Sequence, residues 1–560
     1  MHRCSSKCSL GLRRAADAVD GAAMRRLAAA CLLAAVAAIG KPRKNVKALT
    51  PREFEKQRRE RSLATTKRAM AAEDLQDARA PGTLRLCVRA VFLCWAFLPA
   101  TLTFWLAFFV GPFRRRLWYP LLTWCLGRAG ACFVKWAQWS ATRSDLFPVA
   151  LCNSLAGLQA GAPAHSRRHT KKLVEDAVGC AIDDYFDSFE RKPIASGSIA
   201  QVHRATRKGQ VLAVKVRHPK VGTRLRLDVT LLAFGARCLE VFPPLRALRL
   251  SDTVAQFGDT LAQQSRLDHE AQELRGFRSR FRRWGDVDFP RPTLETPSVL
   301  IESFLPGELV VGIAKRARNF DDLKQGLDRK TGAYLVTRGE DLYLKMLLED
   351  KVMHADLHPG NLLYDGEILV SLSILWGLNI RQSRAISVVD AGMVSPLTHS
   401  ESDRFVGLIE AIGAADAKAA AKNLRAFDPA NAKNLSKEQV RAFDDEVRAL
   451  FREKCRGYGT GVDFGDVVRG LLELVRKHRV RIGAQYATLV INALCLDGMA
   501  GDLLPGYSVL DGARPLLSAH RWFVSRGIPV LGPFVFRRLC LPVAWRLKGL
   551  YDAVAVRQFL

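Results

Sequence analysis

Three short motifs with chemically active side chains follow one another in this chain. The first is ASGSIAQV (195–202), and the strand-like segment QVLAVKV that contains Lys215 comes soon after it. The second is HADLHPGN (354–361), and the third is DAG (390–392), directly after the apolar run ISVV. Small residues let a turn approach phosphates through backbone N–H groups, and carboxylate and amide oxygens bind the metal ions that accompany phosphates. The three motifs together predict a site for a nucleotide and its metal ion.

The first motif keeps the spacing of the loop G-x-G-x-x-G-x-V that covers ATP in kinases. An ordinary Ser/Gly turn is the alternative for this motif taken alone. Lys215 stands in the place of the kinase strand lysine, and strand alternation puts it on the face opposite Val214 and Val216. Its ammonium group can therefore reach an α- or β-phosphate. The loop residues that we assign to cofactor binding are Ala195, Ser196, Gly197, Ser198 and Val202.

The second and third motifs supply acids and an amide. His354, Asp356 and Asn361 reproduce the spacing H-x-D-L-x-x-x-N of the kinase catalytic loop, and Asp390 has the position of the acid that binds metal. We predict that Asp356 orients or deprotonates a hydroxyl group or a water molecule. Asn361 and Asp390 are expected to hold Mg²⁺ on the phosphates of ATP. Each motif alone is compatible with a simple turn, but their order and context make coincidence improbable.

A glutamate on a helix is needed to hold the lysine of such a site. Glu270 is our candidate because Leu267, Ala271 and Leu274 repeat around it at helical spacing, with Glu273 as the alternative. The residues assigned to catalysis are thus Asp356, Lys215 and Glu270. The Leu-rich sequence between Lys215 and Glu270 predicts inserted helices.

Residues 90–113 contain no charged side chain and are bounded by Arg89 and by the triplet Arg114–Arg116. An apolar run of this length is typical of a transmembrane helix, and Trp95 and Trp105 are frequent residue types in membrane proteins. We therefore expect one membrane-spanning helix, which Pro99 would kink. A wholly buried helix of a large domain is the alternative.

The first 50 residues carry ten basic and only two acidic side chains, mixed with Ser and Ala. This composition predicts an organellar presequence at 1–45, followed by a charged linker at 46–85. The apolar but Ala-rich stretch 27–39 leaves a secretory signal as the alternative. The absence of a disulfide framework in the later sequence speaks against secretion.

The whole chain of 560 residues has 85 Lys and Arg against 55 Asp and Glu, a net charge of +30. Such an excess favours anionic partners such as lipid headgroups or nucleotides. We expect no nucleic-acid partner, because no recognition motif accompanies the charge. The 13 cysteines include no Cys-x-x-Cys pair, which excludes a zinc finger or a redox dithiol of that type.

These motifs taken together resemble the UbiB family of atypical kinase-like proteins, the aarF-domain-containing kinases. The resemblance extends roughly from residue 118 to residue 516 and is greatest to the mitochondrial branch of the second aarF-domain kinase. The segments on which it rests are VKWAQWSATRSDLFP (134–148), KPIASGSIAQVHRA (192–205), LAVKVRHP (212–219), EAQEL (270–274), HADLHPGN (354–361) and VVDAGMV (388–394).

The resemblance implies an α+β fold of the bilobal protein-kinase type, with a helical N-terminal extension and one N-terminal transmembrane helix. The expected regions are the extension at 117–165, an N-lobe with a helical insertion at 166–305, a C-lobe at 306–525 and a C-terminal tail at 526–560. In the family, a Lys-x-Gly-Gln motif of the extension folds over the active site and obstructs protein substrates. Lys135 and Gln138 match its Lys and Gln, and Glu302 to Leu305 match the hinge that meets adenine.

The resemblance also implies an ATPase or lipid-directed phosphotransferase that uses ATP and Mg²⁺ and supports ubiquinone or other mitochondrial lipid metabolism. The expected location is the mitochondrial inner membrane, with a plastid membrane as the alternative. Expected partners are membrane lipids such as cardiolipin, an isoprenoid or quinone-like lipid, and lipid-biosynthesis enzymes. A pseudokinase scaffold that binds nucleotide without turnover is the competing interpretation.

Four features depart from the family pattern. Ala137 replaces the glycine of the extension motif, Gly197 lies in the Ala-rich loop, and Gln264 and Arg266 replace an acidic pair. The separation of 29 positions between the second and third motifs is also long for a kinase. The sequence LSILWGLNIRQSRA within it is either a lineage insertion or an error of the gene model.

Overall fold

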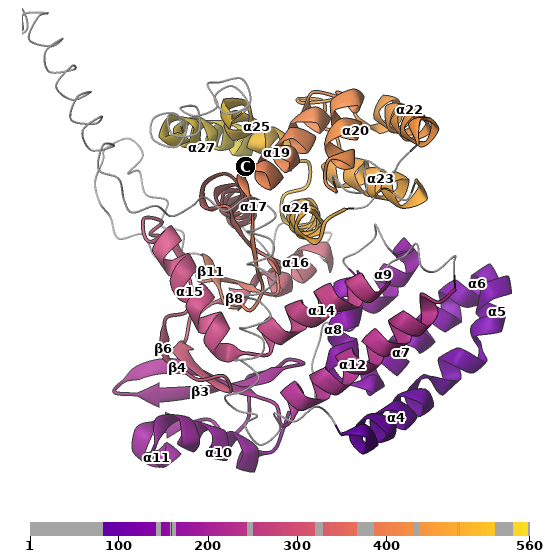
Figure 1. The fold of residues 1–560 in the computed structure, drawn as a ribbon. Helices are drawn as coiled ribbons and strands as arrows, with labels where there is room; N and C mark the ends of the chain where they lie inside the picture. The colour runs from indigo at the N-terminus through magenta and orange to yellow at the C-terminus, as the bar shows by residue number, and fades with distance from the viewer. Residues whose placement is uncertain are drawn as a thin grey trace, which may run out of the picture. The chain divides into compact units, whose positions relative to one another are not determined.

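The computed structural model describes residues 82–141, 147–156, 158, 164–242, 250–319, 329–366, 386–428, 436–478, 480, 482–520 and 541–557 (Figure 1). The predicted presequence lies outside these residues, as do nearly all of the predicted charged linker and the segment LSILWGLNIRQSRA. The described helices and strands have mixed α and β content, with strands concentrated in the middle of the chain.

The N-lobe is built on an antiparallel sheet with strand order β1-β3-β4-β7-β6, in which β2 pairs with β3. Lys208 and Gly209 both have positive φ and form the two-residue turn between β3 and β4, a geometry that matches the twist of a hairpin. The strands are β1 (Ser188–Phe189), β2 (Ala195–Ser196), β3 (Ala200–Arg207), β4 (Gln210–Arg217), β6 (Pro292–Glu295) and β7 (Val299–Ser303).

The two faces of this sheet are covered by different helices. Val214 and Val216 are fully buried on one face, in a core cluster with side chains of α10 (Arg167–Val178) and α11 (Ile182–Tyr185). Leu300 lies on the other face, in a cluster with side chains of α15 (Leu267–Phe281). The face that α15 covers is also the face of Lys215, because Lys215 and Leu300 are direct cross-strand partners.

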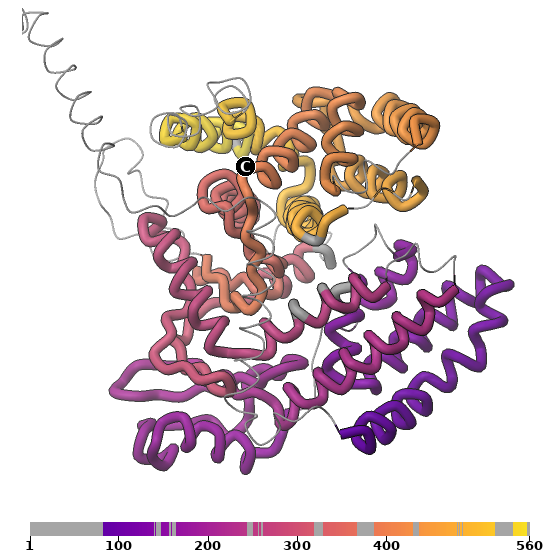
Figure 2. The backbone as a smooth tube through the Cα atoms, viewed as in Figure 1, coloured from indigo at the N-terminus to yellow at the C-terminus, as the bar shows by residue number. Residues whose placement is uncertain are grey.

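The expected inserted helices are α12 (Val221–Leu239) and α14 (Leu250–Gln264), which separate β4 from α15. They share a core cluster with α7 (Tyr119–Ala129), α8 (Ala131–Ala141) and α9 (Val149–Ala156) of the extension, and with partly buried side chains of α4 (Thr83–Leu102). We call these six helices the helical body. In Figure 2 the indigo and violet tube of the N-terminal helices runs alongside the magenta tube of α12 and α14.

The apolar segment 90–113 is not one continuous helix. Helix α4 ends at Leu102, and Thr103 turns its hydroxyl back to donate to Pro99 O (2.8 Å). The short helices α5 (Phe104–Phe109) and α6 (Gly111–Phe113) and the π-helical turn η1 (Arg114–Trp118) follow. Within the described residues, α4 is the one helix that is long and apolar enough to cross a membrane, by length and composition.

The C-lobe is mainly helical, and the largest core cluster lies mostly within it and continues to α15 and β7 of the N-lobe. Its helices include α16 (Val310–Asn319), α17 (Arg329–Lys345), the π-helical turn η3 (Met346–Asp350), α19 (His399–Gly413), α20 (Ala417–Arg425), α22 (Lys437–Lys454), α23 (Phe464–Lys477), α24 (Ala484–Leu503), α25 (Val509–His520) and α27 (Leu541–Arg557). Two of these helices begin with a capping box. Thr398 and Glu401 form one at α19, and Ser436 and Gln439 form one at α22.

Two small sheets hold the C-lobe motifs. One has the order β5-β11-β10-β8, and the other pairs β12 with β9. HADLHPGN begins with the last residue of β9, and DAG follows one residue after β11. The strands are β5 (Val287–Asp288), β8 (Glu308–Leu309), β9 (Val352–His354), β10 (Leu362–Tyr364), β11 (Ile386–Val388) and β12 (Val394–Pro396).

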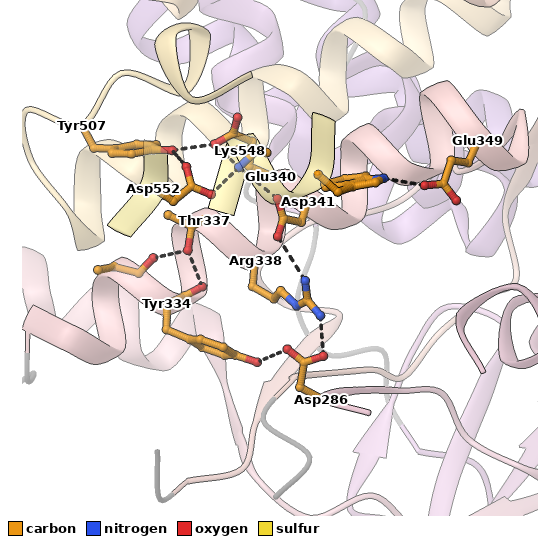
Figure 3. Close-up of polar contacts among 12 residues, drawn as sticks. Asp286, Tyr334, Thr337, Arg338, Glu340, Asp341, Glu349, Tyr507, Lys548 and Asp552 are labelled. Atoms are coloured by element: carbon orange, nitrogen blue, oxygen red, sulfur yellow. Dashed lines mark hydrogen bonds and ion pairs between the residues drawn. The ribbon is translucent and has the colours of Figure 1, made fainter. Parts of the chain in front are cut away.

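The stretch expected to be a C-terminal tail contains α27, which packs against the C-lobe. Lys548 of α27 is 1% exposed and contacts three carboxyl groups, whose residues are Asp552 at 2.7 Å, Asp341 at 2.9 Å and Glu340 at 3.6 Å. Tyr507 donates to Glu340 Oε2 at 2.8 Å (Figure 3). Because a buried ammonium group is stable only with such partners, this ionic cluster fixes α27 to α17.

Candidate active site

The register of the N-lobe sheet gathers the predicted nucleotide-binding side chains on one face. Val202 of β3 is the direct partner of Lys215, and Ala195 of β2 is the direct partner of Val202. Directly paired residues of an antiparallel sheet share a face. Glu302 belongs to the same face, because its partner Ala213 lies two positions before Lys215.

Lys215 is the centre of a compact set of polar contacts. Its Nζ lies 2.5 Å from Glu270 Oε1 and 3.1 Å from Glu302 Oε1, and it donates to Val389 O at 3.1 Å. Glu270 is therefore the residue of α15 that contacts the lysine. The bond to Val389 links the N-lobe to the residue directly before Asp390. An ammonium group has three protons, and these three oxygens provide one acceptor for each.

The electrostatics of this set favour a charged lysine. Burial alone would lower the pKa of Lys215, but Glu270, Glu302 and Asp390 reverse that effect and raise it. Burial raises the pKa of Glu302 to about 8, against the lowering influence of Lys215. Glu302 therefore takes up a proton more readily than an ordinary glutamate, and its buried Oε2 has no hydrogen-bond partner among the described residues.

The catalytic loop is held by its own backbone and by histidine. Asp356 N donates to His354 Nδ1 at 3.2 Å, which leaves the other nitrogen, Nε2, to donate to Asp390 O. Asn361 Nδ2 donates to Asp356 O at 2.9 Å. The side chain of Asp356 is 42% exposed, with His358 Nε2 at 3.7 Å from its Oδ1. Asp356 is thus positioned by the loop but remains accessible to a substrate.

Asp390 is the most strongly positioned acid of the site. Gly392 N donates to its Oδ1 at 2.7 Å. Burial would raise its pKa, but Lys215, this backbone N–H group, Lys135 and His354 together lower it. The group is therefore ionised, and Lys215 and Lys135 are the two lysines that act on it.

Asn361 and Asp390 have free oxygen atoms of the kind that Mg²⁺ prefers. The amide nitrogen of Asn361 is used in the bond to Asp356 O, which leaves its oxygen available, and Asp390 retains Oδ2. The described residues include no group of three or more His, Cys, Asp or Glu that could hold a metal ion. Mg²⁺ at a nucleotide site usually needs one or two protein oxygens besides water and phosphates, so the donor set fits it.

The Ala-rich loop forms a tight turn between β2 and β3. Gly197 N donates to Ala200 O at 2.9 Å, and a ring nitrogen of His218 lies 2.9 Å from Gly197 O. Ser196 Oγ is buried and has no hydrogen-bond partner among the described residues. Ser198 is half-buried in the same turn. The loop therefore offers a hydroxyl group that a ligand can use.

The two extension residues are in different situations. Lys135 on α8 is close enough to Asp390 to lower the pKa of that carboxyl group, so the structure brings it to the site. Gln138 lies one turn further along α8, and its Nε2 donates to Leu158 O at 3.3 Å within the extension. The structure therefore gives Gln138 a local partner. Ala137 between them is fully buried in the core of the helical body.

The expected hinge begins at the end of β7. Glu302 was expected to belong to the hinge that meets adenine; the structure places it in β7 and adds a side-chain contact with Lys215 that the sequence did not indicate. Leu305 is buried two residues after the strand. Gly307 has φ +122°, and a Cβ atom there would lie 2.6 Å from Tyr364 O, so only glycine fits this close approach of the chain to the end of β10.

Two residues that support the site could not be identified from the sequence motifs. Asn492 of α24 donates to His354 O at 2.6 Å across 138 positions of sequence. His218 supports the Ala-rich loop, although it lies within the quoted segment LAVKVRHP. Neither contact could be found without the fold, because both depend on long-range packing.

Comparisons with known proteins identify a matching family model and several relatives. The family model described as the ABC1 atypical kinase-like domain matches residues 157–424. A probable serine/threonine-protein kinase, abkC, of Dictyostelium discoideum is 28% identical over 79% of this chain and 70% of its own length. A mitochondrial ABC1 family protein of Schizosaccharomyces pombe is 29% identical over 72% of this chain and 65% of its own length.

A probable protein kinase UbiB of Pseudomonas paraeruginosa is 29% identical, over 71% of each chain. The chain thus spans about two thirds of the length of these relatives. The matched region contains Lys215, Glu270, Asp356, Asn361 and Asp390, whereas Lys135 lies before it. The chain carries an ABC1 atypical kinase-like domain, and its homologues are mitochondrial proteins of the ABC1/UbiB family and UbiB kinases.

Proposed function

We propose that this protein is a membrane-anchored atypical kinase or ATPase of the UbiB type that binds Mg-ATP. We further propose that it supports ubiquinone biosynthesis or mitochondrial lipid metabolism. The observation that carries the proposal is the placement of Lys215, Asp356 and Asp390 around one point between the lobes. Lys215 donates to Val389 O, directly before Asp390, and His354 links Asp390 O to the backbone N–H group of Asp356.

Each residue has a role that follows from its contacts. Lys215, held by Glu270, would neutralise phosphate charge, as in phosphoryl-transfer sites generally. Asn361 and Asp390 would hold Mg²⁺, which when bound supplies charge neutralisation on the phosphates. Asp356 would accept a proton from the attacking hydroxyl group or water, because it is partly exposed and fixed by its loop.

The location and partners are part of the same proposal. The mitochondrial name of the yeast relative and the basic N-terminal sequence support the mitochondrion, and the apolar N-terminal helices support its inner membrane. The proposed partners are cardiolipin and other membrane lipids, an isoprenoid or quinone-like lipid, and lipid-biosynthesis enzymes. The names of the UbiB relatives and the strong positive charge support these choices.

A second candidate function is a nucleotide-binding scaffold without turnover. The observation that favours it is the complete use of Lys215 Nζ by Glu270, Glu302 and Val389 O. A phosphate group can contact this ammonium only if one of the three oxygens gives way. If the ammonium group rarely exchanges one of these oxygens for a phosphate, the site would bind nucleotide without catalysis.

Two substitutions in the purified full-length protein test the proposal. Asp390→Asn should abolish Mg²⁺-dependent nucleotide binding in calorimetry, because the metal loses its anionic ligand. Asp356→Asn should preserve binding and remove ATP turnover, because it acts on the nucleophile. Asp445→Asn, at an exposed position of α22, is the control that should change neither. Unchanged Mg-ATP affinity in Asp390→Asn would contradict the metal assignment, and binding without turnover in the parent would favour the scaffold.

A further inference from the structure

Helices α4 and α7, with the short elements between them, form an antiparallel hairpin over residues 83–129, which we call the apolar hairpin. Near its base Arg89 donates to Ala129 O at 2.6 Å. Near its tip Trp118 Nε1 donates to Ala100 O at 2.9 Å. These two bonds show that the chain runs out along α4, turns, and returns along α7.

The inner face of the apolar hairpin packs against the other helices of the helical body, including α12. Arg89 donates to both oxygens of Asp228 on α12, at 2.6 and 2.8 Å, and Asp228 is 1% exposed. Ala96 and Ala100 of α4 are buried. Replacing the Arg89 side chain would leave the Asp228 carboxylate buried without this partner, which typically costs about 3–5 kcal/mol.

The outer face of the apolar hairpin is an exposed hydrophobic surface. On α4 a helical stripe of Val91, Trp95, Leu98 and Leu102 is exposed, with Trp95 at 61%. The guanidinium group of Arg128 lies over the rings of both Trp95 and Trp124, so the surface continues onto α7. Soluble monomers rarely expose a contiguous apolar surface of this kind. The tip adds exposed Phe104, Trp105, Phe108, Phe109 and Val110.

The charges around this surface indicate what covers it. Residues 82–141 contain no Asp or Glu but seven Lys and Arg, and the triplet Arg114–Arg116 lies at the tip. Aromatic side chains next to arginines are typical of proteins at the headgroup level of a bilayer. Anionic lipid attracts such basic clusters, whereas a second copy of this chain would bring like charges together.

Helix α4 as a whole has the length and composition of a membrane span, but its uncharged part is too short to cross the hydrocarbon core. The uncharged helical part of α4, from Ala90 to Leu102, has 13 residues. At about 1.5 Å per residue it is roughly 20 Å long, against about 30 Å for the hydrocarbon core. Helix α5 adds only six residues after the break at Thr103. The return of the chain along α7 also leaves both ends of the hairpin at the helical body.

We propose that the apolar hairpin inserts its outer face into one leaflet of an anionic phospholipid membrane and does not cross it. This inference gives the topology of the membrane anchoring proposed above and rests on it. Amphipathic surfaces of this kind enter about 5–10 Å below the headgroups. In that arrangement the arginine triplet meets lipid phosphates, and residue 82 and the kinase-like domain lie on the same side of the membrane.

Vesicle flotation of the full-length protein tests the surface. Binding to phosphatidylcholine vesicles that contain cardiolipin should exceed binding to phosphatidylcholine alone. The double substitution Trp105→Glu and Phe109→Glu should lower the bound fraction at least tenfold. The matched control is Val543→Glu with Leu547→Glu, on another exposed apolar stripe, and it should have no effect. Equal loss in both variants, or none in the hairpin variant, would overturn the proposal.

Protease protection tests the topology. In proteoliposomes an epitope inserted after Gly82 and one at the C-terminus should both be cut by protease added outside, in the fraction whose kinase-like domain faces outward. Protection of the Gly82 epitope alone would show a spanning helix and overturn the proposal. A loss of dimers in the hairpin variant with full vesicle binding would assign the surface to a second copy instead.

Nucleotide binding separates this inference from the proposed function. The hairpin variant should keep the parent's Mg-ATP affinity, because its substituted residues lie on the tip and outside the candidate active site. Loss of vesicle binding with normal nucleotide binding supports the leaflet arrangement. Normal vesicle binding in a protein without any Mg-ATP affinity would instead refute the proposed function and leave the topology intact.

Discussion

Glu302 and Lys215 face each other across neighbouring strands, with 3.1 Å between Glu302 Oε1 and Lys215 Nζ. The second oxygen of this glutamate is buried without a hydrogen-bond partner among the described residues, and its pKa is raised to about 8. The carboxyl group therefore becomes an anion close to the phosphate-binding lysine only as pH rises through this raised pKa.

This relationship predicts a pH-dependent affinity for Mg-ATP. Between pH 7 and pH 9 the parent should lose affinity by about five- to tenfold, or roughly 1–1.4 kcal/mol, because Glu302 ionises and repels phosphate. Glu302→Gln keeps the shape of the side chain and should remove this loss. Calorimetric titrations at the two pH values measure both. Glu270→Gln, which releases the lysine, should weaken binding at both; a parallel decline in Glu302→Gln and parent would contradict the role of Glu302.

A second prediction concerns Lys135, which lowers the pKa of Asp390 from the extension. Removing this cation should change the charge around the terminal phosphate. We expect Lys135→Ala to alter the ratio of ADP to ATP affinity or to expose autophosphorylation that the parent lacks. Lys437→Ala, an exposed lysine at the start of α22, is the control. If Lys135→Ala equals the parent in both measurements, the extension does not control access to the site.

A third prediction follows from the ionic cluster that fixes α27. Burial raises the pKa of Glu340 to about 8, against an unfolded value near 4.5. The folded state thus retains a proton that the unfolded state releases, and this contribution to stability is lost as pH rises from 4.5 to 8. The loss is at most about 1.4 kcal/mol per pH unit.

Thermal unfolding of the parent and of Glu340→Gln at pH 6, 7.5 and 9 measures the effect. The glutamine can accept the hydrogen bond from the Tyr507 hydroxyl group, but it does not ionise. The melting temperature of the variant should therefore fall less with pH than that of the parent. Glu453→Gln, at an exposed position of α22, should follow the parent. An identical pH dependence in all three proteins would show that Glu340 does not hold the proton.

A fourth prediction concerns the connection between β10 and β11. Tyr364 and Ile386 are direct partners in this antiparallel pair, so the two ends of the intervening segment already meet. Deleting residues 368–384 would leave a four-residue connection, a usual length for a hairpin loop. We expect the shortened protein to fold with a melting temperature within a few degrees of the parent and to keep Mg-ATP binding. Loss of cooperative unfolding would show that the segment belongs to the core.

The sequence was sufficient to find the residues that lie close together in sequence motifs. Lys215, Asp356, Asn361 and Asp390 each belong to a short motif whose spacing is set by a strand or a loop, and the structure brings these residues to one site. Glu270 could be identified from helical periodicity, because α15 buries one face. The inserted helices could be predicted from their Leu-rich composition.

Contacts made by packing over long sequence distances could not be predicted. The carboxyl group of Glu302 reaches Lys215 because of the register of β4 and β7, and Asn492 reaches His354 across 138 positions. The predicted C-terminal tail contains the packed helix α27. Its buried Lys548 forms ion pairs with acids of α17 and with Asp552 of α27 itself. The expected span at 90–113 was based on the length of an uncharged apolar run, and the length of such a run does not reveal that the helix breaks at Thr103.

Only Ser265 and Arg266 separate the end of α14 from the start of α15, the helix that carries Glu270. Helix α14 packs with α12 and α8, and α12 in turn holds Arg89 of the apolar hairpin through Asp228. A displacement of the hairpin by a lipid surface would therefore be transmitted through α12 and α14 to α15, and so to the Glu270–Lys215 ion pair. Membrane contact and the alignment of the phosphate-binding lysine would then be mechanically coupled.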